Sequence, residues 1–123
     1  MAEAMALGKP VIATGYSGNT DFMTSQNSYL VDWDLTAVGM DAEHYPADAT
    51  WAEPSIDHAA ELLRELHADS EGAAARGERA AADIAAALSP EAVGRIARER
   101  LIRVAARRTD STSARSSERS EAV

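Results

Sequence analysis

The sequence of 123 residues contains no cysteine and few aromatic residues, and both shortages limit what the chain can be. Without cysteine there is no disulfide framework and no thiol catalysis. Aromatic residues make up 5% of the chain, and alanine supplies much of its 46% hydrophobic content. Alanine favours helix but buries little area per residue. We therefore expect a single small domain with a modest core and marginal stability.

Long apolar runs are also lacking. No stretch approaches the roughly 20 apolar residues that a transmembrane helix needs. The first seven residues carry an acidic side chain and no basic region, and their apolar run is too short for a signal peptide. These features predict a cytoplasmic chain without a transmembrane segment.

Basic residues are fewer than acidic ones. The chain has 12 Lys and Arg residues and 20 Asp and Glu residues, which gives a net charge of −8. A nucleic-acid backbone repels such a chain, so we expect no nucleic-acid partner. The charge is uneven: residues 1–71 hold 13 acidic and two basic side chains, whereas residues 72–123 hold seven acidic and ten basic ones. We interpret the arginines within residues 100–108 as the solvated face of a helix, with docking to an acidic partner as the alternative.

The first third of the chain alternates helix and strand signals. Residues 2–7 are strong helix formers, and Gly8 suits the left-handed position that ends a helix. The short apolar run at residues 11–13 is typical of a strand buried on both faces, and residues 28–31 predict a second strand. The sequence TGYSGN at residues 14–19 predicts a loop between them.

The rest of the chain predicts a long irregular segment followed by three helices. Residues 32–54 are acidic and contain scattered aromatic residues, and we expect them to form an irregular loop. Ser55 is a suitable N-cap for the first helix, Ser70 begins a second that extends to about Leu88, and Ser89 caps a third. Apolar residues recur at helical spacing in the first and third helices, at Ile56, Ala59, Ala60, Leu63 and Leu66 and at Val93, Ile96, Ala97, Leu101 and Val104.

This order of elements predicts an α/β fold in which the last strands of a parallel sheet are closed by helices. The chain opens on what looks like the end of a helix, so we expect it to be the C-terminal part of a larger enzyme. Residues 109–123 are rich in Ser, Arg and Glu and are expected to form a disordered tail.

Several segments resemble one family. The strings EAMALGKPVIAT at residues 3–14, GNTDFM at 18–23 and NSYLV at 27–31 are similar to the C-terminal domain of retaining glycosyltransferases of the GT-B fold, family 4. Further similar segments extend the resemblance over about residues 2–101; they lie at 45–46, 51–54, 57–60, 76–80 and 89–91. The resemblance implies an incomplete Rossmann-like domain of GT-B type over residues 1–108, made of the C-terminal strands and the closing helices.

The resemblance also implies a function. The parent enzyme would transfer a sugar, with retention, from a UDP-, GDP- or ADP-sugar to an acceptor, without a further cofactor because the nucleotide-sugar is a substrate. Glu3 matches the second of two glutamates that flank seven residues in the family, which implies contact with the ribose hydroxyls. A carboxylate accepts two hydrogen bonds from such a diol. The first glutamate, the basic residues for the diphosphate and the acceptor domain have no counterpart here, so we expect this chain to be inactive alone.

The loop after the first strand supplies two more candidates. Ligands of open α/β sheets bind outside the carboxyl ends of the strands, which favours a donor contact from Gly18 or Asn19. The alternative, a loop whose glycines only satisfy turn geometry, carries equal weight.

Other polar motifs are weaker evidence for a functional site. Asp32 and Asp34 have the Asp-x-Asp form that holds a divalent ion in a different glycosyltransferase fold, but the motif is short and lies past the wrong strand. We therefore expect no metal. The histidines lack ligand spacing, so we expect surface or helix-cap roles for His44, His58 and His67.

An alternative from another class is a non-catalytic remnant that acts as a helical interaction module. Missing strands would leave the apolar stripes at residues 56–66 and 93–104 uncovered. Uncovered stripes of this kind predict self-association.

Overall fold

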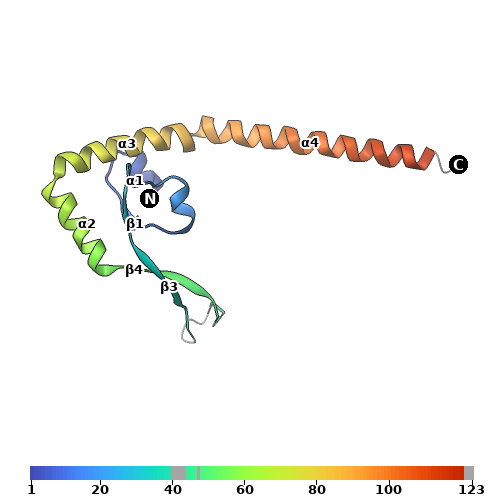
Figure 1. The fold of residues 1–123 in the computed structure, drawn as a ribbon. Coiled ribbons are helices and arrows are strands. Elements are labelled where there is room, and N and C mark those ends of the chain that lie inside the picture. The colour runs from blue at the N-terminus through green and yellow to red at the C-terminus, as the bar shows by residue number, and fades with distance from the viewer. Residues whose placement is uncertain (40–43, 47, 121–123) are drawn as a thin grey trace. The chain divides into compact units, whose positions relative to one another are not determined.

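The computed structural model describes the backbone of residues 1–39, 44–46 and 48–120, and side chains as far as residue 107. The chain has a mixed α/β fold. Its elements, in chain order, are α1 (Ala2–Ala6), β1 (Ile12–Thr14), the 3₁₀ helix η1 (Ser17–Asp21), β2 (Tyr29–Val31), β3 (Trp33–Ala37), β4 (Thr50–Pro54), α2 (Ile56–Ala68), α3 (Ser70–Leu88) and α4 (Pro90–Ser120) (Figure 1).

The first two strands form a parallel pair, as predicted. Ile12 lies opposite Tyr29, and Thr14 lies opposite Val31. The expected burial of β1 on both faces is only partly confirmed, because Ile12 and Ala13 are half-buried. In the described residues this sheet has two strands, so each strand keeps one edge without a partner.

The prediction that residues 32–54 form an irregular loop was wrong where β3 and β4 pair as an antiparallel hairpin. Trp33 lies opposite Pro54, and this proline is tolerated because it ends its strand. Apolar and polar residues alternate from Trp33 to Ala37, which is a strand pattern. For residues 40–43 and 47 the loop prediction lies outside the described residues.

The predicted glycine stop after α1 and the predicted serine caps of α2 and α4 are confirmed. Gly8 has a φ of 68° after α1, and the amides of Gly8 and Lys9 donate to the carbonyls of Met5 and Ala4 in the pattern of a Schellman motif. The Ser55 hydroxyl accepts from the amide of His58 at the start of α2. The same capping bond joins the Ser89 hydroxyl to the third residue of α4.

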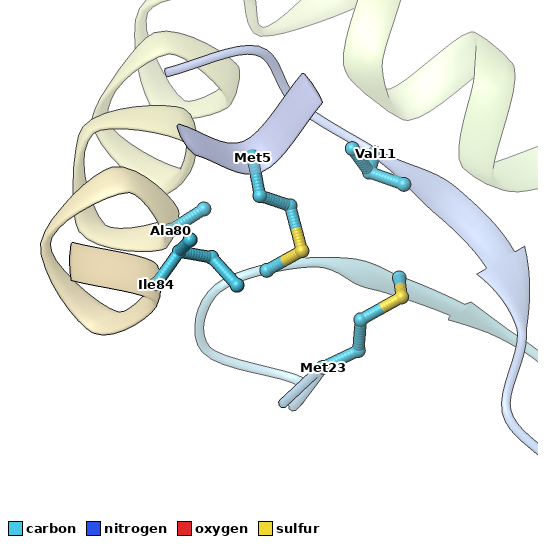
Figure 2. Packing of buried hydrophobic residues seen from close by; sticks show 5 residues of the cluster. All are labelled: Met5, Val11, Met23, Ala80 and Ile84. Carbon is cyan, nitrogen blue, oxygen red and sulfur yellow. The ribbon is translucent and has the colours of Figure 1, made fainter. Parts of the chain in front are cut away.

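The main core lies where α1 and α3 meet the parallel strands. Its buried members come from four separate segments and point toward one another: Met5, Val11, Met23, Ala80 and Ile84 (Figure 2). Met5 is fully buried although α1 has only five residues, so this short helix is held by packing more than by its own backbone bonds.

A buried polar contact fastens α3 to the segment before β2. The side-chain nitrogen of Asn27 donates to the carbonyl of Phe22 at 3.0 Å and to the carboxylate of Asp83 at 2.8 Å. Its oxygen accepts from the amide of Thr24 at 2.7 Å. Arg76 adds a second link, because its guanidinium lies 4.0 Å from the centre of the Tyr29 ring.

Helix α2 packs against β1 and β2 with only part of its apolar stripe. Leu62 and Leu66 are half-buried, whereas Ile56 and Leu63 are 73% and 58% exposed. The predicted stripe is therefore partly uncovered.

Contacts divide the chain into two compact units, residues 1–86 and residues 87–123. The first contains both sheets. The second contains α4, whose large apolar side chains are exposed at Val93, Ile96, Leu101, Ile102 and Val104. The disordered tail expected at residues 109–123 overlaps the last turns of α4 and stays a prediction, as does the domain boundary at residue 108; residues 121–123 lie outside the described part. None of the described helices has both the length and the apolarity needed to cross a membrane.

Candidate ligand-binding site

The loop at the carboxyl end of β1 is held tightly against β2. The amide of Gly15 donates to the carbonyl of Val31 at 2.9 Å. A Cβ atom on Gly15 would lie 3.3 Å from the Cβ of Leu30, so a larger residue would push the loop away from the sheet. The small residue therefore fixes where the loop leaves the strand.

The following residues close the loop on itself. Asn19 donates from its side-chain nitrogen to the carbonyl of Thr14 at 2.9 Å, and the Thr20 hydroxyl donates to the carbonyl of Ser17 at 2.6 Å. Ser17 has a φ of 66°, a left-handed conformation that costs a non-glycine residue free energy. Such backbone conformations persist where the surrounding bonds over-determine them, and they are frequent at ligand sites.

Strand β3 holds the same loop from the other side. The indole nitrogen of Trp33 donates to the carbonyl of Gly15 at 2.7 Å. The ring of Trp33 also meets the ring of Tyr16 edge to face, with 4.6 Å between their centres. The Tyr16 ring is thus positioned while its side chain stays 39% exposed.

An open cavity of about 740 Å³ lies between this loop and the β3–β4 hairpin. Trp51 of β4 lines it and is 45% exposed. Five of the lining residues carry a hydroxyl group: Thr14, Tyr16, Ser17, Tyr45 and Thr50. Among the described lining residues none has a carboxylate, guanidinium or lysine side chain. Hydroxyl groups and aromatic rings therefore make up most of the described wall, together with Met1, two alanines and Asn19.

The three candidate residues take different positions around this cavity. Asn19 lines it. Gly18 does not, and the space around its Cβ position is open to 4 Å. Glu3 does not line the cavity, but it is bonded to a residue that does. Met1 lines the cavity, and its amino group donates to the Glu3 carboxylate at 3.3 Å. The candidates therefore share one region, but only Asn19 faces the cavity itself.

Glu3 is an exposed carboxylate, with 91% of its side chain accessible. A hydrogen bond from its own backbone amide, together with the hydrogen bond and charge of the Met1 amino group, lowers the pKa of Glu3. The carboxylate is thus ionised at neutral pH and available to accept hydrogen bonds from a diol.

Sequence reasoning missed the residues that the hairpin contributes. Thr50 and Trp51 lie on β4, and Trp33 reaches the loop from β3. The available signal was the strand-like alternation that starts at Trp33. Even that pattern does not say which loop the hairpin meets, because such a contact joins residues far apart in the sequence.

The Asp-x-Asp motif is engaged in other contacts. Nδ1 of His58 lies 3.0 Å from both the amide nitrogen and a carboxylate oxygen of Asp32. Asp34 lies opposite Glu53 in the hairpin, which places two acids side by side. In the described residues no three acidic or histidine side chains gather as a metal site would require.

No family model matches this chain, no curated protein matches it, and no solved structure matches it.

Proposed function

We propose that this chain forms part of the donor-binding half of a retaining GT-B glycosyltransferase, with an incomplete Rossmann-like fold. In this proposal the ligand is a nucleotide-sugar and the reaction is transfer of its sugar to an acceptor. In this proposal the chain by itself does not catalyse transfer. The cytoplasmic location expected from the sequence belongs to the same proposal.

The observation that carries the proposal is the position of the cavity. It opens at the carboxyl end of β1 in a parallel pair, where Thr14 ends the strand and also lines the cavity. Ligands of open α/β sheets bind at this end of the strands. Glu3 supports the assignment, because its ionised carboxylate accepts a hydrogen bond from Met1, which lines the cavity.

Catalysis in the complete enzyme would depend on stabilising the diphosphate as it leaves. Groups that carry positive charge do this best. No basic side chain lines the described cavity wall. We therefore expect this chain to bind a donor without turning it over.

Thermal unfolding tests this proposal. A ligand that binds only the folded chain stabilises it by about 2.7 kcal/mol at 100 times its Kd, so the matching UDP-, GDP- or ADP-sugar should raise the melting temperature. Glu3→Gln should weaken binding about tenfold or more, because it removes the charge from the hydrogen bonds to the diol.

Glu71→Gln is the matched control. Glu71 is also an exposed glutamate in the first turn of a helix, and it lies outside the cavity wall. Its substitution should leave the ligand-induced shift unchanged. The proposal fails if none of the three classes of nucleotide-sugar shifts the melting temperature, and measurable sugar transfer by this chain contradicts its predicted inactivity.

The exposed apolar side chains favour a second candidate, a helical interaction module that self-associates. Ile56 and Leu63 on α2 remain largely uncovered, as do Ile96 and Leu101 on α4. Light scattering that shows a dimer, combined with a melting temperature that no nucleotide-sugar changes, would favour this function over donor binding.

A further inference from the structure

We propose that the cavity between the Tyr16 loop and the hairpin binds a neutral saccharide ring, stacked on Trp51, and does not hold a phosphate group. This inference rests on the proposed function, because it assigns one part of the donor to one part of the site. The same chemistry is offered by the sugar end of a nucleotide-sugar and by a free sugar.

Charge disfavours a phosphate at the cavity wall. A bound diphosphate loses its hydration and needs cationic side chains or converging amides to replace it. The described wall has no Lys or Arg side chain, and the amino group of Met1, which lines the cavity, is paired with Glu3. The chain as a whole carries a net charge of −8, which repels anions further.

The hydroxyl groups of the wall match a sugar. Each hydroxyl both donates and accepts, as each sugar hydroxyl does, so the two sets can pair in several ways. Thr14 and Ser17 supply such groups from the loop, and Tyr45 and Thr50 supply them from the opposite side. A nucleobase instead needs donors and acceptors in a fixed pattern. Asn19 is the sole amide side chain in the described wall, and its nitrogen already donates to the carbonyl of Thr14.

The aromatic rings provide the apolar surface that a pyranose face needs. Trp51 and Tyr16 line the cavity from β4 and from the loop, and both stay partly exposed. Tyr16 is held by its edge-to-face contact with Trp33, so a ligand does not have to order this ring. The volume of about 740 Å³ falls within the range of small-molecule sites and leaves room for more than one ring.

Indole signals in a nitrogen-15 NMR spectrum test the inference, because the chain has two tryptophans that occupy different places. Methyl α-glucopyranoside and methyl α-mannopyranoside are the free-sugar probes, and uridine and UDP are the sugar-free probes. At least one glycoside should shift the Trp51 indole signal more than that of Trp33, and uridine should not.

Trp51→Ala identifies the signal by its loss and should weaken glycoside binding about tenfold, measured on the amides of Ser17 and Thr50. Leu35→Ala is the control, since Leu35 is 57% exposed on the same hairpin and lies outside the cavity wall. It should leave the affinity unchanged, and a dispersed spectrum shows that either variant is folded.

The outcomes separate this inference from the proposed function. If a nucleotide-sugar raises the melting temperature through Glu3 but the glycosides leave Trp51 unchanged, the donor site stands and the saccharide assignment is wrong. If a glycoside binds at Trp51 but no nucleotide-sugar stabilises the chain, the donor function is wrong and the cavity is a sugar site of another kind. Stronger shifts with uridine or UDP than with the glycosides overturn the inference.

Discussion

Met5→Ala is expected to destabilise the fold by about 2–5 kcal/mol, the usual cost of removing a large buried side chain from a core. Met5 is fully buried, and it lies among side chains from β1, α3 and the segment before β2. Alanine supplies about half of the apolar residues of this chain, so a loss of this size is a large fraction of the total stability. Urea denaturation followed by circular dichroism measures the change in the free energy of unfolding.

Leu7→Ala is the matched control for this substitution. Leu7 is an apolar residue of similar size, two positions further on, but it is 75% exposed. Its replacement should change the free energy of unfolding by less than about 0.5 kcal/mol. Equal losses for the two variants would contradict the placement of Met5 in the core.

Gly77→Ala is expected to cost about 3 kcal/mol, at the upper end of the range for overpacking. A Cβ atom at Gly77 would overlap the carbonyl oxygen of Gly8 and lie 3.0 Å from its carbonyl carbon. Both are backbone atoms, so no side-chain rotation relieves the overlap. Alanine favours helix over glycine by about 1 kcal/mol, and this gain offsets only part of the loss.

Gly18→Ala makes the same chemical change in the same unit without the overlap. The space around its Cβ position is open to 4 Å, and Gly18 does not have a positive φ. Thermal melting should therefore show a clear drop for Gly77→Ala and little change for Gly18→Ala. A Gly77→Ala variant as stable as the parent chain would mean that α3 does not approach the turn after α1 this closely.

Local chemistry in the sequence was enough to predict the helix ends. Gly8, Ser55 and Ser89 are each recognisable because a helix end needs a left-handed residue or a hydroxyl within a few positions. The parallel pairing of β1 and β2 also followed from short apolar runs in an α/β order. The assignment to the GT-B type stays a prediction.

Contacts between distant residues were not accessible in the same way. Gly77 reads as an interruption in a helix, and only the structure shows the close approach to Gly8 that requires it. The cavity likewise depends on Tyr16 and Trp51, which are far apart in sequence and line the same cavity because Trp33 fastens the hairpin to the loop. Of the candidate residues, Asn19 reaches the cavity wall because its own side chain closes the loop.

The most direct test of the central claim is to map where a nucleotide-sugar binds, using amide signals in a nitrogen-15 NMR titration with UDP-, GDP- and ADP-sugars. Donor binding at the carboxyl end of β1 predicts shifts for Gly15, Ser17 and Asn19 in the loop and for Glu3 beside it. Signals from α4 should stay in place. Unchanged loop signals with all three ligand classes, or shifts confined to α4, would contradict the claim that this loop belongs to a donor site.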